Sequence, residues 1–295
     1  MGLEQQFRSM VVELLREAAT SIPSDVVEGL QRAYERETNP LAKRQLEAIL
    51  KNIELAQARR LPVCQDTGTP YFYVKLGDRF PLRSEIYALI RDAVAEATKS
   101  VPLRPNAVDP IRGRNSGNNT GRFIPWVEVE LVEGDYVEVA AVLKGGGSEA
   151  PSRLMVASPL EAGKRLWELV LRAVVEAGPK PCPPVIIGVG IGAGPDIAMS
   201  LAKKAAVLRE VGSRHPEPEV AALEEKLLEA VNKLGIGPHG FGGMTTALDL
   251  HIEYAHRHPA TFAIAVSTSC WATRRAKARM SSSGSWFFID RKRKP

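Results

Sequence analysis

Cysteine is scarce in this chain of 295 residues, and its three cysteines are far apart, at Cys64, Cys182 and Cys270. An odd number of widely spaced cysteines argues against a disulfide framework. The spacing also lacks the close ligand pairs of zinc sites and the tight cysteine runs of ferredoxins. These absences leave free thiols whose role has to be found from their surroundings.

Long apolar runs are also lacking. No uninterrupted stretch is long enough to span a bilayer, and no charged start followed by an apolar run opens the chain. Hydrophobic residues at 44% and charged residues at 25% are ordinary values for a globular protein. We therefore expect a folded cytoplasmic protein.

The charge is mild. A formal net charge of +5 permits anionic partners, but the basic residues are not concentrated in the patches of a nucleic-acid binder. Small acidic molecules fit this charge equally well, so we expect neither a nucleic-acid nor a membrane partner.

What is present is an unusual polar stretch at residues 61–70, LPVCQDTGTP. It places a thiol (Cys64), an amide (Gln65), a carboxylate (Asp66) and a hydroxyl (Thr67) in consecutive positions between two prolines. Proline fixes φ and glycine permits unusual backbone conformations, so this composition predicts a stiff, irregular loop that presents reactive groups.

Helices alternate with strands along the chain without internal repeats, which indicates a mixed α/β (α+β) class. A helical lead at residues 1–60 is expected to precede a core at 61–280, with a flexible tail at 281–295. Asn39 and Pro40 form a typical helix start. Helices are expected at residues 5–20, 26–34, 40–58, 84–98, 197–211 and 216–234, and strands at 71–76, 185–189, 248–254 and 261–266.

Two further patterns predict local structure. Alternating residues at 127–131 and 136–143 predict a β-hairpin, and Ser158 with Glu161 predicts a capping box at the start of a helix. Residues 102–120 are rich in proline, glycine and asparagine, which predicts a long irregular loop. Such loops inside a domain are usually functional or disordered.

The bland interpretation of the cysteines is that each is a small buried hydrophobe. Each of them, however, lies at a junction between an irregular and a regular segment. Cys270 precedes WATRRAKARM, whose pattern suggests a helix, so its thiol is expected near a helix N-terminus beside two arginines. Both effects favour the thiolate. Three thiolates suffice for an iron–sulfur cluster in which one iron stays open as a Lewis acid.

Several motifs together resemble one family. VCQDTGTP, LRPNAVDP with NSGNNTG, LKGGGSE, PCPP, GIGPHGFGGMTTALDLHI and HPATFAIAVSTSCWATRR occur in this order over residues 5–280. They resemble the α subunit, equivalent to the N-terminal domain, of class I iron–sulfur fumarate hydratases and L-tartrate dehydratases.

This resemblance implies a site. Cys64, Cys182 and Cys270 would be the three ligands of a [4Fe–4S] cluster with one open iron. Asp66 would be catalytic as well as substrate-binding. The other substrate contacts would be Gln65, Arg104, Gly146, Gly147 and His258.

Physical chemistry agrees with these roles, because an arginine fork suits a carboxylate and successive glycine amides bind anions. Each residue also has a simpler interpretation. Arg104 alone is typical of a solvated surface charge, Asp66 of an Asx turn, and His258 of a turn cap before Pro259. By composition alone, His239 is as plausible a site histidine.

The resemblance implies a hydro-lyase that interconverts (S)-malate and fumarate, a reaction of the tricarboxylic acid cycle, with L(+)-tartrate dehydratase as the alternative. Remaining catalytic residues would come from a separate β subunit in an α₂β₂ assembly. The tail departs from the family's pattern: it is either disordered, or its residues Trp286, Phe287 and Phe288 dock on the partner subunit.

Two other functions remain open. GVGIGA at residues 188–193 satisfies the dinucleotide fingerprint, with Glu210 about twenty residues later, which would suit an NAD-dependent oxidoreductase. The other alternative is a non-catalytic scaffolding subunit.

Overall fold

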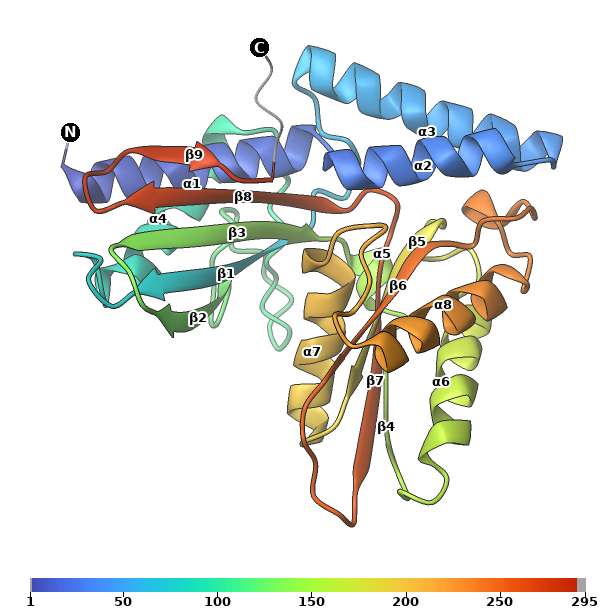
Figure 1. Ribbon diagram of the computed structural model, residues 1–295. Helices are drawn as coiled ribbons and strands as arrows, with labels where there is room; N and C mark the ends of the chain where they lie inside the picture. The colour runs from blue at the N-terminus through green and yellow to red at the C-terminus, as the bar shows by residue number, and fades with distance from the viewer. Residues whose placement is uncertain (1, 291–295) are drawn as a thin grey trace. The chain divides into compact units, whose positions relative to one another are not determined.

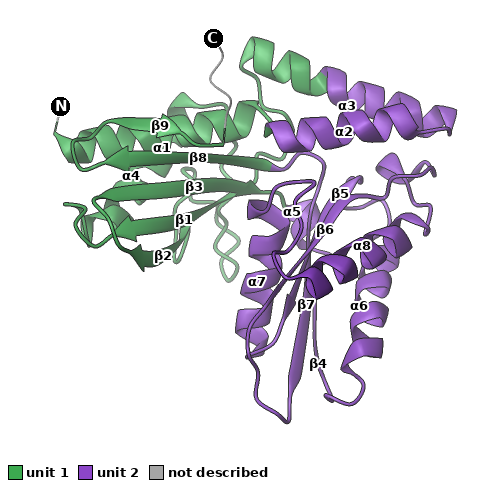
Figure 2. Cartoon of the chain, viewed as in Figure 1, with its two compact units in different colours: residues 1–23, 52–145, 274–295 green, residues 24–51, 146–273 purple. Residues whose placement is uncertain are grey.

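The computed structural model describes residues 2–290, and the chain divides into two compact units (Figure 2). Each unit has its own sheet and its own hydrophobic core. The mixed α/β class is therefore confirmed. Unit 1 takes in Met1–Pro23, Asn52–Gly145 and Arg274–Pro295, and unit 2 takes in Ser24–Lys51 and Gly146–Thr273.

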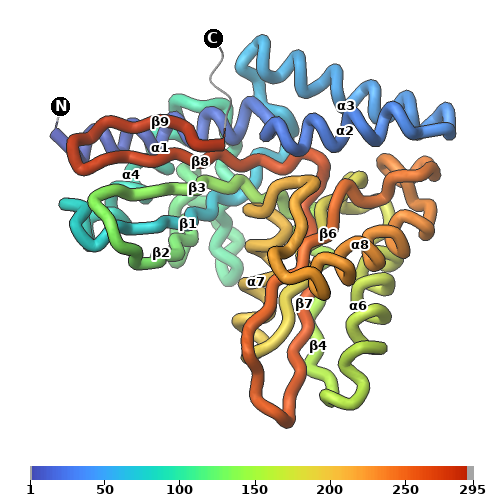
Figure 3. Tube along the Cα trace, viewed as in Figure 1, coloured from blue at the N-terminus to red at the C-terminus, as the bar shows by residue number. Residues whose placement is uncertain are grey.

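Unit 1 is built on a five-stranded sheet in the order β2-β1-β3-β8-β9. Its elements are α1 (Leu3–Thr20), β1 (Thr69–Gly77), α4 (Glu85–Ser100), β2 (Trp126–Val132), β3 (Tyr136–Lys144), β8 (Arg274–Ser281) and β9 (Trp286–Phe288) (Figure 1). The apolar stripe of α1 is fully buried and packs on β3 and β8 and against α4. As Figure 3 shows, β8, near the end of the chain, thus runs beside its first helix.

The hairpin predicted from residues 127–143 is wrong. β2 and β3 are neighbours in sequence, but β1 lies between them, parallel to β2 and antiparallel to β3. β1 carries Phe72, Val74 and Leu76 into the core, so it is favoured as a central strand. The turn between β2 and β3 is fastened to the end of β1, because the amide of Gly134 donates to Asp78 Oδ1 at 2.8 Å.

The helix predicted directly after Cys270 is also wrong. Residues 274–281 form β8, in which Ala276, Ala278 and Met280 are buried with the period of two that a strand requires. The helix-dipole argument for the Cys270 thiolate therefore falls.

The aromatic segment near the C-terminus is a strand and not the flexible segment expected. β9 pairs with β8, and the rings of Trp286 and Phe288 meet edge to face with centroids 5.4 Å apart. Both pack against the unit 1 core, and Phe287 points outward, 46% exposed. Docking of these aromatics on a partner stays a prediction, and the basic tip at 291–295 lies outside the described residues.

Unit 2 has a four-stranded sheet in the order β4-β7-β5-β6. Its elements are α2 (Ser24–Arg36), α5 (Gly146–Glu149), β4 (Arg153–Ala157), α6 (Ala162–Ala177), β5 (Val185–Ile191), α7 (Pro195–Leu208), α8 (Pro218–Asn232), the 3₁₀ turn η1 (Pro238–Gly240), β6 (Ala247–Tyr254) and β7 (Phe262–Ser269). β4 was not predicted from the sequence. Helix α3 (Pro40–Arg59) begins in unit 2 and ends in unit 1.

The two predicted helix starts have different outcomes. The Asn39 cap is confirmed, because its Oδ1 accepts the amides of Leu41 at 2.9 Å and Ala42 at 3.4 Å. The capping box at Ser158 is wrong, since α6 begins only at Ala162 and has no side-chain cap. The amide of Glu161 instead donates to the carbonyl of Ser158 at 3.0 Å, which closes a turn before the helix.

The glycine run after residue 187 has a packing explanation. Gly188 and Gly190 face α7, and a Cβ on them would lie 2.0 Å from the carbonyl oxygen of Ala202 and 1.9 Å from that of Ala198. Glycine is required here because α7 lies directly on β5. The dinucleotide fingerprint is thus accounted for without a nucleotide. Within the described part of the chain, no helix is both long and apolar enough to cross a membrane.

Candidate functional site

The predicted site residues of unit 1 gather at one end of its sheet. β1 begins, β3 ends and β8 begins at this end, as the pairs Thr69–Lys144 and Leu143–Arg274 show. The loop that carries Cys64 leads into β1, and the long loop after α4 leads into β2, which starts at the same end because it runs parallel to β1. Sheet topology therefore brings Cys64, Gln65, Asp66 and Arg104 to the same end of the sheet.

Side-chain hydrogen bonds join the two loops. The buried Thr67 hydroxyl accepts the backbone amide of Arg104 at 2.9 Å and Asn106 Nδ2 at 3.3 Å. Arg104 Nη1 in turn donates to the carbonyl of Gln65 at 3.4 Å, while its side chain stays exposed. The arginine is thus held near the Cys64 loop with its guanidinium accessible, which suits the capture of a carboxylate.

Asp66 makes the Asx turn that the sequence left open as its simpler role. Its Oδ1 accepts the amide of Gly68 at 2.9 Å. Its Oδ2 lies toward Gly145, where a Cβ would come within 3.1 Å of it. One oxygen of the carboxylate therefore holds the loop, and the other faces the end of β3, so the turn does not exclude a chemical role.

The long loop is braced and not disordered. Asn119 Oδ1 accepts the amide of Asn106, and its Nδ2 donates to the carbonyl of Arg104 at 2.9 Å. Asn115 Nδ2 donates to the carbonyl of Pro105 at 2.8 Å. The asparagines that predicted a loop are the side chains that fix its shape.

The unit 2 residues gather at one end of the second sheet. β4, β5 and β6 begin where β7 ends, as the pairs Arg153–Val266, Val185–Ala247 and Ile186–Ser269 show. Cys182 precedes β5, Cys270 follows β7, and Gly146 and Gly147 open α5 just before β4. A Cβ on Gly146 would meet nothing within 4 Å, so the backbone there borders open space.

The three thiols are not typical core residues. Cys64 and Cys270 are partly exposed, Cys182 is exposed, and none of them is in a disulfide. Cys182 has a left-handed backbone with φ of 54°. A non-glycine residue there is uncommon and is often found at functional sites. The interpretation of the cysteines as buried hydrophobes is therefore wrong.

The donor set suits an iron–sulfur group, because accessible thiolates are its usual ligands. The thiols are divided between the units, with Cys64 in unit 1 and the other two in unit 2. Among residues 2–290, no three His, Cys, Asp or Glu side chains are gathered as a metal site. Ligation by all three cysteines stays a prediction.

His239 lies between the two cysteine segments of unit 2. Its backbone amide donates to the carbonyl of Pro183 at 2.9 Å, and its Nε2 accepts the indole N–H of Trp271 at 3.0 Å. Burial lowers the pKa of His239, so the neutral ring with the proton on Nδ1 is favoured. By composition, His239 in GPHGFGG was as plausible a site histidine as His258, but its contacts with Pro183 and Trp271 could not be found from the sequence.

His258 lies at the opposite end of the unit 2 sheet, before β7 begins. β7 spans eight residues. A strand of that length separates its ends by about 25 Å. His258 Nδ1 accepts the amide of Ala260 at 3.1 Å, the turn-capping role that was its simpler interpretation. Within unit 2 the structure does not bring His258 together with Cys182 and Cys270.

Two buried cations lie beside the Asp66 loop. From the sequence, Lys144 had no predicted role and Arg274 was expected only to favour the Cys270 thiolate. Lys144 and Arg274 are both nearly inaccessible to solvent, at the end of β3 and the start of β8. A charged residue in a strand gives no sign of burial in the sequence, so only the pairing of β3 with β8 identifies them.

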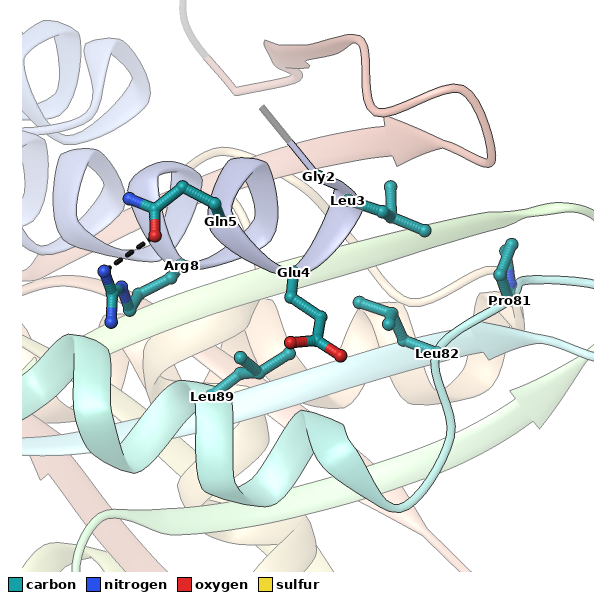
Figure 4. A pocket seen from close by; sticks show the side chains of 8 residues that line it. All are labelled: Gly2, Leu3, Glu4, Gln5, Arg8, Pro81, Leu82 and Leu89. Atoms are coloured by element: carbon teal, nitrogen blue, oxygen red, sulfur yellow. Dashed lines mark hydrogen bonds between the residues drawn. The ribbon is translucent and has the colours of Figure 1, made fainter.

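A hollow of about 520 Å³ elsewhere in unit 1 carries none of the predicted residues. It lies at the start of α1, where Gln5 accepts a hydrogen bond from Arg8 at 2.7 Å (Figure 4). Leu3, Leu82 and Leu89 line it together with the oppositely charged Glu4 and Arg8.

Comparison with known proteins identifies the family of the chain. A family model described as fumarate hydratase (Fumerase) matches residues 8–279, so the chain belongs to this family. The chain is 42% identical over 276 residues to a protein of Methanocaldococcus jannaschii provisionally named L(+)-tartrate dehydratase subunit alpha, covering 92% of this chain and 96% of that protein.

Two bacterial relatives have the same name without qualification. The L(+)-tartrate dehydratase subunit alpha of Escherichia coli strain UTI89 is 41% identical over 263 residues, 89% of this chain and 86% of the relative. That of Shigella boydii serotype 4 is 41% identical over 258 residues, 87% of this chain and 85% of the relative.

Proposed function

We propose that the chain is the α subunit of a hydro-lyase that removes water from a hydroxylated dicarboxylate, with L(+)-tartrate as substrate. The observation that carries this proposal is the identity of 41–42% to L(+)-tartrate dehydratase α subunits over most of both chains. These relatives support the tartrate alternative better than the fumarate expectation.

Fumarate hydratase is the second candidate, and the description of the matching family model favours it. Malate has one hydroxyl fewer than tartrate. A site with a hydrogen-bonding partner for that second hydroxyl rejects malate strongly, because the buried partner would otherwise stay unpaired. A polar contact to that hydroxyl would therefore favour tartrate over malate.

In the proposed reaction the residues of unit 1 bind and orient the acid. Arg104 offers an exposed guanidinium to one carboxylate, and Gln65, also exposed, offers an amide beside it. Asp66 Oδ2 holds or accepts a proton at the reacting carbon pair, because its Oδ1 is already used in the turn. In unit 2 the amides of Gly146 and Gly147 would bind an anionic oxygen.

Cys64, Cys182 and Cys270 would hold a [4Fe–4S] cluster. When bound, a cluster with one iron not held by cysteine supplies a Lewis acid for the departing hydroxyl. Support comes from the accessibility of all three thiols and from the sheet register that puts Cys182 and Cys270 at one end of unit 2.

The remaining catalytic groups would come from a β subunit, since the relatives are named as α subunits. The α₂β₂ stoichiometry is what the family resemblance implies. The proposal does not assign a substrate contact to His258, whose role stays a prediction.

Two measurements test the proposal. After anaerobic reconstitution, about four irons and four sulfides per chain are expected, with loss of iron in Cys182→Ser. A folded chain that repeatedly stays without iron would contradict the cluster. Turnover of L(+)-tartrate and (S)-malate by the assembled enzyme then decides the substrate, and an assembled, iron-loaded enzyme that dehydrates neither would refute the hydro-lyase function.

A further inference from the structure

Arg274 is a buried arginine at the end of the unit 1 sheet that carries the Asp66 loop. It is only 3% exposed and stands opposite Leu143 in the β3–β8 register. A buried guanidinium is stable only if its N–H groups find acceptors. The identity of those acceptors shows what the residue does.

Its acceptors lie on two segments far apart in the sequence. Arg274 Nε donates to the carbonyl of Leu143 at 3.1 Å, and Nη1 donates to the backbone carbonyl of Asp66. The guanidinium therefore links Asp66, which carries the candidate catalytic carboxylate, to Leu143 near the end of β3. The planar fork of arginine can make both bonds at once, whereas the single ammonium of lysine cannot reproduce them.

Gly145 shows how closely the two charges approach. A Cβ at Gly145 would lie 3.0 Å from Arg274 Nη2 and 3.1 Å from Asp66 Oδ2. The two atoms are thus no more than about 6 Å apart. The backbone of Gly145 is not left-handed, so glycine serves here to leave room for both side chains.

We propose that Arg274 is the positioning residue of the Asp66 loop: it fixes the Asp66 carbonyl, and across the bare backbone of Gly145 it sets the place of the Oδ2 atom. Gly68 fixes the other carboxylate oxygen through its amide, so the side chain is held from two sides. The catalytic role of Asp66 in this inference rests on the proposed function, but the contacts do not.

The first test measures how well the Asp66 loop is held in place and does not depend on enzyme activity. Hydrogen exchange of the full chain is compared between wild type, Arg274→Lys and the surface control Arg279→Lys on the same strand. In Arg274→Lys, exchange in the peptide covering residues 61–72 is expected to rise at least about tenfold, with residues 276–281 unchanged. Equal exchange in all three proteins would overturn the inference.

The second test uses the assembled, iron-loaded enzyme, with rates normalised to iron content. Arg274→Lys is expected to lower kcat about 100-fold with KM changed much less, because misplacing a reacting group affects the transition state most. A merely structural role would lower the folded fraction and leave kcat per iron unchanged.

Gly145→Ala keeps the inference falsifiable if Arg274→Lys does not fold. The added methyl group pushes Oδ2 and Nη2 apart while Arg274 is retained, so it is expected to reproduce the loss of kcat. Normal kcat in Gly145→Ala would overturn the inference. A wild-type enzyme without dehydratase activity would instead refute the proposed function and leave the exchange test to decide the role of Arg274.

Discussion

The two units hold their candidate residues by different means. In unit 1 the Cys64 loop is irregular, and buried polar side chains such as Thr67 and Arg274 fasten it through backbone amides and carbonyls. In unit 2, Cys270 directly follows β7 and Cys182 stands three residues before β5, so the sheet places both, and its stability depends on glycine packing and on the ion pair of the buried Glu224. Substitution of these polar side chains in unit 1 should therefore loosen the Cys64 loop. Substitution at the packed glycines or the ion pair of unit 2 should instead destabilise the core of that unit.

The largest effect is expected for Gly190→Ala in unit 2. The new Cβ would lie 1.9 Å from the Ala198 carbonyl oxygen, so α7 has to leave β5. We expect a loss of about 5 kcal/mol or more in the free energy of unfolding, or no folded protein. Urea unfolding measures it.

The matched control is Gly163→Ala in α6, where a Cβ meets nothing within 4 Å. It should gain up to about 1 kcal/mol from helix propensity. A folded Gly190→Ala protein with wild-type stability would contradict the packing explanation.

Glu224→Ala should have the next largest effect. The Glu224 side chain is fully buried and accepts Arg209 Nη1 at 2.7 Å and the amides of His215 and Ile252 at 2.9 and 2.8 Å. Its loss leaves the buried Ile252 amide, the partly buried His215 amide and the Arg209 guanidinium without that acceptor, and should cost about 3–5 kcal/mol. Glu225→Ala is the control: its side chain is 66% exposed, and its pair with Arg214 spans 3.6 Å. An exposed pair contributes less than about 1 kcal/mol, so similar unfolding midpoints for both variants would refute the network.

In unit 1, Thr67→Val should act mainly on function. The change keeps the shape but removes the acceptor for the Arg104 amide and for Asn106, at a cost of about 1–3 kcal/mol. Because Arg104 loses its anchor, KM for the dicarboxylate should rise about tenfold in the assembled enzyme. The control Thr69→Val changes the same atoms at the first residue of β1. An unchanged KM in Thr67→Val would show that Arg104 is placed by other contacts.

The smallest effect concerns pH and His239. Burial lowers the pKa of His239 in the folded state below its ordinary value of 6.5. The unfolded state therefore binds a proton more readily than the folded state. The contribution of His239 to the free energy of unfolding is complete above pH 6.5 and is lost as the pH falls toward the lower pKa of the folded state. Asparagine tolerates the left-handed backbone at this position, where φ is 51°. The stability advantage of wild type over His239→Asn should thus shrink between pH 8 and pH 5 in urea unfolding, and a constant difference would contradict it.

Local patterns predicted the elements well where one periodicity dominates. α1, α3 and α7 lie close to their expected ranges, and the Asn39 cap is present. The pattern was misleading at residues 271–280, where a run of alanine and arginine suits a helix locally but pairs with β3 as a strand. Tertiary pairing outweighs local propensity there because Ala276, Ala278 and Met280 complete the unit 1 core.

The sequence by itself determined the mixed α/β class and the family resemblance, and it nominated the candidate site residues, because these depend on residue types and their order. Only the tertiary structure decided which of them meet. Sheet register places Cys182 and Cys270 at one end of unit 2 and His258 at the other, and it brings Arg274 to Asp66 across more than two hundred residues of sequence. No local pattern encodes such proximity, since it results from strands that are distant in the chain becoming neighbours in a sheet.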